Sequence, residues 1–195
     1  MHRMSLMILP LLAACAEERA PEPVPSPTPA PPAPAPAPSP TPLAALTPDG
    51  WGPLRIGMTR DQVEAVLGSD AEPDAAGGPD PAACDQFRPA RAPAGLLVMV
   101  EDGRLTRVSL IRDAAIRTDR GLGLGATVEA VQQAYRGAIR SEPHEYLAPP
   151  GRYLTYRHDG GGADARGIRY EIGTDGRVTA IHAGGRAITY SEDCA

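Results

Sequence analysis

The sequence predicts an α+β fold of two repeated units, each a short helical segment packed on a small antiparallel β-sheet. The first observation is Ile-Gly-Met-Thr at 56–59, which recurs as Leu-Gly-Ala-Thr at 124–127, a shift of 68 (125 − 57). The second is Asp-Gly-Arg-Leu-Thr at 102–106, which recurs with Val for Leu at 175–179, a shift of 73 (175 − 102). The third, lying between them, is Gly-Leu at 95–96, matched by Gly-Ile at 167–168. Matches in the same order indicate two copies of one supersecondary unit.

The first fifteen residues have the layout of an export signal. A short basic start precedes an apolar run at 4–12, and small residues follow the run. The run is too short for a transmembrane helix, which needs roughly 20 apolar residues. Leu-Ala-Ala-Cys at 12–15 resembles the lipobox of bacterial lipoproteins. This resemblance implies that residues 1–14 are a signal peptide and that Cys15 carries the lipid.

The lipidated chain is expected to stay at a membrane, because each buried methylene of an acyl chain contributes about 0.8 kcal/mol. In enteric bacteria an Asp directly after the lipidated Cys tends to retain a lipoprotein in the inner membrane. Here that position is Ala16. We therefore expect an outer-membrane location, with the folded part facing the periplasm.

Residues 15–48 are expected to form the lipid anchor and a Pro-rich disordered linker. Nearly every second residue at 21–42 is proline, which fixes φ and donates no backbone hydrogen bond. This composition is typical of a polyproline II spacer that rises about 3.1 Å per residue, or roughly 70 Å in all. A ligand for a proline-binding domain is the alternative interpretation.

The first unit, residues 49–113, is expected to hold one short helix and one hairpin. Thr59 can cap the helix, and Gln62, three residues later, completes a capping box. The apolar stripe and the stop of this helix follow at Val63, Val66, Leu67 and Gly68. An Asp-Gly pair at 102–103 then predicts a tight hairpin turn. The strands on its two sides are expected at 96–100 and 105–111.

The second unit, residues 114–195, repeats this order. Thr127 caps its helix, and Glu129 favours the positive helix start. The stripe of this helix consists of Val128, Val131 and Tyr135. Its strands are expected at 153–157, 168–172 and 178–183, with a second Asp-Gly pair at 175–176. Apolar and charged residues alternate at 168–172, which is typical of a sheet with one buried face.

With Cys15 lipidated, Cys84 and Cys194 remain as one pair of thiols. An exported chain with an even number of thiols is expected to oxidise them. The bridge would close a loop of about 110 residues, worth about 4–5 kcal/mol on a chain-entropy estimate. Metal ligation is disfavoured, because the two cysteines are far apart in the sequence and no His lies at zinc-finger spacing.

The helix and hairpin motifs together resemble a known family. Gly-Met-Thr-Arg-Asp-Gln-Val at 57–63, with Val-Glu-Asp-Gly-Arg-Leu at 100–105, resembles the small outer-membrane assembly lipoproteins (SmpA/OmlA, or BamE-like). A tandem of two such units resembles the β-lactamase-inhibitor-protein architecture, and the likeness covers most of residues 52–183. It implies protein–protein contacts and no catalytic centre, and from the residues themselves we expect no cofactor and no metal. The long acidic segment at 69–83 and the placing of one cysteine in each unit depart from these families.

The leading functional hypothesis is a non-enzymatic lipoprotein that binds another envelope protein. By analogy with the tandem family, the sheet surface away from the helices is the expected contact face. Its candidate members are Arg107, Arg169, Glu171 and His182. The net charge of −5 and the lack of a basic run disfavour nucleic acid as a partner.

The alternatives are a small-ligand or cell-wall-glycan binder and, with less support, a hydrolase. Aromatic faces stack on sugars, and tyrosines gather in the second unit, where they could equally fill the core. These tyrosines are Tyr146, Tyr153, Tyr156, Tyr170 and Tyr190. A hydrolase lacks support because there is no Gly-x-Ser-x-Gly elbow and no free thiol.

Two further patterns are interpreted structurally. Residues 121–126 match the dinucleotide pattern G-x-G-x-x-A, but Gly125 is the counterpart of Gly57, which has no such fingerprint around it. The histidines lack the i, i+4 pairing of a zinc protease and are expected on the surface or in hairpins. They are His144, His158 and His182.

Overall fold

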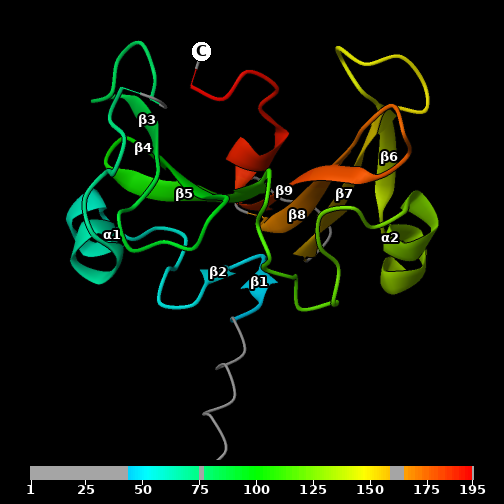
Figure 1. Ribbon diagram of the computed structural model, residues 1–195, viewed down its shortest axis with the longest axis horizontal. Helices are drawn as coiled ribbons and strands as arrows, with labels where there is room; N and C mark the ends of the chain where they lie inside the picture. Colours follow the sequence, from blue (N-terminus) through cyan, green and yellow to red (C-terminus); the bar gives the residue numbers. More distant parts are fainter. Residues whose placement is uncertain (1–43, 75–76, 159–164, 195) are drawn as a thin grey trace, which may run out of the picture. The chain divides into compact units, whose positions relative to one another are not determined.

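The computed structural model describes residues 44–74, 77–158 and 165–194, which belong to one compact unit. Its main element is a seven-stranded antiparallel sheet with the order β3-β4-β5-β9-β8-β7-β6 (Figure 1). The strands are β3 (Cys84–Phe87), β4 (Leu96–Glu101), β5 (Arg104–Ile111), β6 (Arg140–Pro143), β7 (Arg152–Arg157), β8 (Gly167–Ile172) and β9 (Val178–Gly184). The predicted signal peptide, the lipid site at Cys15 and the linker up to residue 43 lie outside the described residues.

The other described elements are short. A two-stranded hairpin, a pair of α-helices and a 3-10 helix accompany the large sheet. They are β1 (Leu46–Thr47), β2 (Gly50–Trp51), α1 (Arg60–Leu67), α2 (Val128–Tyr135) and η2 (Arg186–Thr189).

The predicted fold class is wrong. The described chain is mostly β, and its strands form one large sheet rather than two small ones that each carry a helix. β5 and β9 join the two parts of the sheet by antiparallel pairing from Arg107↔Gly184 to Ile111↔Ala180. Without this pairing each strand would present an open edge of unpaired N–H and C=O groups. Removing both edges at once is the physical reason for a single sheet.

Local sequence explains where α1 begins and ends. The predicted capping box is confirmed, since the Gln62 N–H donates to Thr59 Oγ1 at 3.3 Å and the Thr59 N–H donates to Gln62 Oε1 at 2.9 Å. Gly68 ends the helix at φ 86°, a conformation that costs glycine little. The buried stripe is narrower than predicted, because Val66 is 37% exposed. Val63 and Leu67 are the buried residues of α1.

The two helices are attached to the sheet in the same way. The Gly57 N–H donates to Leu105 O at 2.8 Å ahead of α1, and the Gly125 N–H donates to Val178 O at 2.8 Å ahead of α2. Thr127 caps α2 through the backbone N–H of Ala130 at 3.2 Å. The repeated motifs therefore form similar local contacts within one shared sheet.

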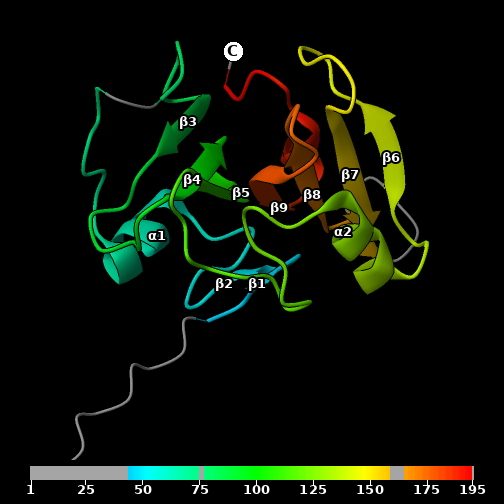
Figure 2. The same cartoon turned by 45° about the vertical axis from the view of Figure 1, so that its right-hand side comes forward.

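The large sheet has two chemically different faces. Both helices and the β1–β2 hairpin cover an apolar face, while the C-terminal segment lies on the opposite side (Figures 1 and 2). The sheet side chains in this main core are Phe87, Leu96, Val98, Val100, Leu105, Val108, Leu110, Leu154, Ile168, Tyr170, Ile172, Val178, Ile181 and Ala183. Within it, the hydroxyls of Tyr135 and Tyr170 lie 3.0 Å apart.

We predict that urea unfolds this unit in one transition. Trp51 lies in β2, whereas all six tyrosines lie at or after position 135, so the two residue types report on different parts of the chain. The fluorescence of Trp51 and the NMR signals of incorporated 3-fluorotyrosine should share one midpoint, because β5–β9 pairing couples both parts. Two separate midpoints would show that the parts unfold independently.

Candidate functional site

The second face of the sheet carries polar side chains and is called the polar face here. In antiparallel strands, residues directly opposite each other project to the same face. Leu97 lies opposite Ser109, Ser109 opposite His182, and His182 opposite Arg169. Glu171 lies two residues beyond Arg169 on the same strand and shares this face. The polar face therefore runs across β4, β5, β9 and β8.

All four residues of the predicted contact face lie on the polar face, but their exposure differs. Arg107 is fully buried, and Arg169 and His182 are each only 7% exposed. The side chain of Glu171 is 26% exposed. Arg107 consequently cannot touch a partner, and Glu171 is the most accessible member of the set.

Arg107 instead holds the end of the chain. Its guanidinium donates to the Asp193 carboxylate, to Gln86 Oε1 and, at 3.2 Å, to Ala187 O. Asp193 and Ala187 belong to residues 186–194, which we call the C-terminal strap. Charge-assisted hydrogen bonds from a buried cation are among the stronger polar contacts, so Arg107 ties the strap to the centre of the sheet.

Two residues that lie opposite each other on β3 and β4, Cys84 and Glu101, also bind the strap. The Sγ atoms of Cys84 and Cys194 lie 2.11 Å apart, at disulfide-bonding distance. The Tyr190 hydroxyl donates to Glu101 Oε1 at 3.0 Å. The strap therefore covers one part of the polar face. Ser109 and His182 lie next to that covered part.

A line of hydrogen bonds crosses the polar face at His182. Its Nδ1 lies 2.8 Å from Ser109 Oγ, and its Nε2 lies 3.4 Å from Glu171 Oε1. The Glu171 carboxylate can only accept, so we assign the ring proton to Nε2. Nδ1 then accepts from the Ser109 hydroxyl, and three polar groups are satisfied by one another.

The environment favours this arrangement of charges. Burial lowers the pKa of His182 below its usual value; the hydrogen bond to Glu171 opposes this shift, and the charge of Arg107 adds to it. Burial alone would raise the pKa of Glu171, but the hydrogen bond from His182 and the positive charge of Arg169 bring it below its usual value. The result is a neutral imidazole beside an ionised carboxylate.

Hydroxyl, imidazole and carboxylate in a line can also activate a serine nucleophile. Ser109, however, lies in a strand that is paired on both sides. Backbone N–H groups around it are engaged in the β-ladders and are not free to stabilise a tetrahedral oxyanion. Sequence reasoning missed this line and expected His182 on the surface or in a hairpin. Its 73-residue separation from Ser109 leaves no local signal.

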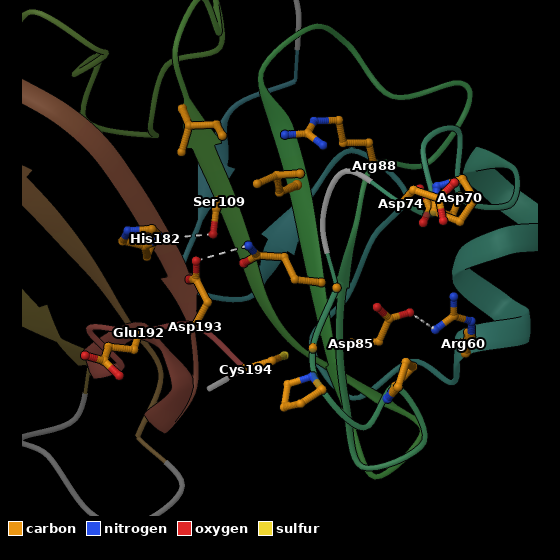
Figure 3. Close-up of a pocket in the computed structure, with 18 of the residues that line it drawn as sticks. Arg60, Asp70, Asp74, Asp85, Arg88, Ser109, His182, Glu192, Asp193 and Cys194 are labelled. Atoms are coloured by element: carbon orange, nitrogen blue, oxygen red, sulfur yellow. Dashed lines mark hydrogen bonds and ion pairs between the residues drawn. The ribbon is translucent and has the colours of Figure 1, made fainter.

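A pocket of about 980 Å³ opens on the polar face beside the strap. Ser109 and His182 lie on one side of it, with Asp193 and Cys194 of the strap below them (Figure 3). Asp85 and Arg60 lie on the other side, near α1. A volume of about 300–1,000 Å³ is typical of ligand sites, so this pocket could receive a segment of a partner.

Some of the charges around the pocket form close ion pairs. Arg60 forms ion pairs with Asp85 and, at 2.9 Å, with Glu64. Arg88 differs, because its Nη1 is buried without a hydrogen-bond partner and lies 3.8 Å from Glu72 Oε2. Within residues 44–74, 77–158 and 165–194, no group of three or more His, Cys, Asp or Glu is placed to hold a metal ion.

The predicted tyrosine cluster is divided between the core and the surface. Tyr170 is fully buried and Tyr153 is 4% exposed. The Tyr153 ring lies between the Arg169 guanidinium, 3.6 Å from its centroid, and the His144 ring, at 4.4 Å. Neither ring offers a platform on which a sugar could stack, whereas Tyr146 is 57% exposed.

We predict that acid destabilises the fold through His182. In the unfolded chain the pKa of His182 has its ordinary value of 6.5. As the pH falls below 6.5, His182 binds a proton in the unfolded state but stays neutral in the folded state. The free energy of unfolding therefore falls. Glu171, whose folded pKa is lowered, adds a further loss below its ordinary value of 4.5.

Urea unfolding between pH 7.5 and 5.5 measures the effect. His182→Asn should flatten the slope, by up to about 1.4 kcal/mol per pH unit, the limit for one proton. A variant with the same slope as the original chain would contradict a buried neutral His182.

We also predict that removing the cysteine pair lowers the free energy of unfolding substantially. Cys84 and Cys194 are separated by 110 residues, so their bond removes much entropy from the unfolded chain. The double variant Cys84→Ala/Cys194→Ala should lower the free energy of unfolding by about 4–5 kcal/mol on this basis. Urea unfolding of oxidised protein provides the measurement, and a chemically reduced sample serves as control. A loss below about 1 kcal/mol would contradict the prediction.

Comparisons with known proteins identify no family for this chain. No protein-family model matches it, and no curated protein matches it. Among solved structures, it is similar to a crystal structure of a DUF4309 family protein, YjgB, from Bacillus subtilis. The TM-score is 0.41 at 19% sequence identity, over 66% of this chain and 78% of that chain. The resemblance to the SmpA/OmlA lipoproteins accordingly stays a prediction.

Proposed function

We propose that this protein is a lipid-anchored module of the cell envelope that binds another protein through the polar face and catalyses no reaction. The observation that carries the proposal is the pocket of about 980 Å³ on that face. It lies beside the row in which Arg169, Glu171 and His182 meet. The opposite face is filled by both helices, so the polar face is where a partner can reach the sheet.

The lipid anchor in this proposal is inferred from the sequence. Cys15 would attach the chain to the outer membrane, and the linker would carry the folded unit into the periplasm. None of the helices in the described residues is long and apolar enough to cross a bilayer.

The chemistry of the polar face supports binding over catalysis. Ser109 and His182 are satisfied by a closed line of hydrogen bonds in a paired region of the sheet. Such a line rigidifies a surface, and partners bind best to preorganised surfaces. Charged side chains surround the pocket, as in the polar rim of a protein–protein interface.

Photo-crosslinking in cells tests the proposal. A photoreactive amino acid would replace Arg140 on β6 or Glu192 on the strap, both exposed on the polar side. Glu129, exposed on α2, is the matched control on the opposite side. We expect one recurrent protein adduct from the polar positions, at least about tenfold stronger than from the control, as for a specific contact.

The opposite result is equally definite. Adducts of equal strength from Arg140, Glu192 and Glu129, or none from any of them, would contradict a protein-binding polar face.

A further inference from the structure

We propose that Arg88 and Arg112 form a carboxylate-binding end of the pocket, which takes an acidic side chain of the partner with an aliphatic residue beside it. This inference rests on the proposed function and specifies the chemistry of the partner segment. Both arginines line the pocket, together with Leu97, Ser109 and Ile111.

Arg88 is positioned by the edge of the sheet. It follows Phe87, the last residue of β3, and alternation places it on the same face as Gln86, which lies opposite Met99. In Figure 3 its side chain extends over the strands toward the side of Ser109 and His182.

One nitrogen of Arg88 lacks a proper acceptor. Nη1 is buried and makes no hydrogen bond, and the nearest carboxylate oxygen, Glu72 Oε2, is 3.8 Å away. The Glu72 side chain is 60% exposed, so water screens this weak ion pair. The Arg88 side chain as a whole is 21% exposed and lines the pocket, so its accessible part could donate a charge-assisted hydrogen bond to a carboxylate there, which is a stronger interaction.

Arg112 supplies a second cation at the end of β5. It is exposed, and no hydrogen bond or ion pair joins its side chain to another of the described residues. Its φ of 56° is unusual for a residue with a side chain, so the chain turns sharply where Arg112 meets the pocket. Arginine side chains suit carboxylates, because the planar guanidinium donates two parallel hydrogen bonds.

Apolar side chains between the arginines and Ser109 define the neighbouring group. Leu97 is 4% exposed, and Ile111 is partly exposed beside it. An aliphatic side chain of the partner could pack on this surface while its neighbour's carboxylate meets the arginines.

The surrounding charges favour a carboxylate over a phosphate. The pocket is also lined by acids that include Asp70, Asp74 and Glu192, and the whole chain carries a net charge of −5. Their repulsion acts more strongly on a dianion than on a monoanion, because Coulomb energy scales with charge. The structure therefore fits a single carboxylate.

Peptide binding to the full-length protein in detergent tests the inference. The probe is a fluorescent peptide, Gly-Leu-Glu-Leu-Gly with blocked ends, and its partner probe has Gln in place of Glu. Fluorescence anisotropy should show the Glu peptide binding roughly tenfold more tightly, as expected for a charge-assisted contact. Arg88→Gln and Arg112→Gln should each weaken the Glu peptide by roughly five- to tenfold and leave the Gln peptide unchanged.

Arg136→Gln is the matched control, because Arg136 is an exposed arginine at the end of α2, on the opposite side of the sheet from the pocket. It should bind both peptides like the original chain. Circular dichroism melting establishes that every variant is folded. Equal affinity for the two peptides, binding of neither, or equal losses in all three variants would overturn the inference.

A further arm uses hexanoate, which has a carboxylate and an aliphatic chain but no peptide backbone. Competition by hexanoate as strong as by unlabelled peptide would overturn a partner segment as the occupant. The crosslinks from Arg140 and Glu192 separate this inference from the proposed function. If those crosslinks form while Arg88→Gln and Arg112→Gln have no effect, protein binding stands and the carboxylate site fails.

Discussion

The pairing of β5 with β9 is the constraint on which the rest of the structure depends. It joins five residue pairs, from Arg107↔Gly184 to Ile111↔Ala180, and makes one sheet of seven strands. On one face it brings the packing surfaces of both helices into a continuous core. On the other it places Ser109 opposite His182. The apolar core and the polar face are thus two consequences of the same pairing.

A buried charge organises the polar face. Arg107 is fully buried, and such a cation is tolerated only when acceptors surround it. Asp193, Gln86 and Ala187 supply acceptors for its Nη1 and Nη2, whereas Nε is buried without a hydrogen-bond partner among the described residues, and two of the three acceptors belong to the strap. The same contacts therefore stabilise the buried charge of Arg107 and fix the position of the chain end. With the strap in this position, the pocket lies between the strap and the edge of the sheet.

Local elements of the fold were predictable, because short-range interactions decide them. The Asp102 and Gly103 turn has φ values of 48° and 71°, as expected for a tight hairpin with a strong sequence signal. β3 and β6 were missed, because Cys-Asp-Gln-Phe and Arg-Ser-Glu-Pro have neither the length nor the alternation of a typical strand. Both lie at the edges of the sheet, where pairing with one neighbour defines a strand that composition does not.

By itself, the sequence determined the capped helices, the Asp-Gly hairpins and the alternation along β8, because each depends on residues within a few positions of one another. The four residues named as a contact face by analogy with the tandem family do share the face away from the helices, because alternation along the strands puts them there, and their contact with a partner stays a prediction. Only the tertiary structure decided that Arg107 is buried, that His182 joins Ser109 and Glu171, and that a pocket lies beside them. The physical reason is that β5 and β9 lie far apart in the chain. Their register is selected by the energy of the whole sheet and not by any local segment.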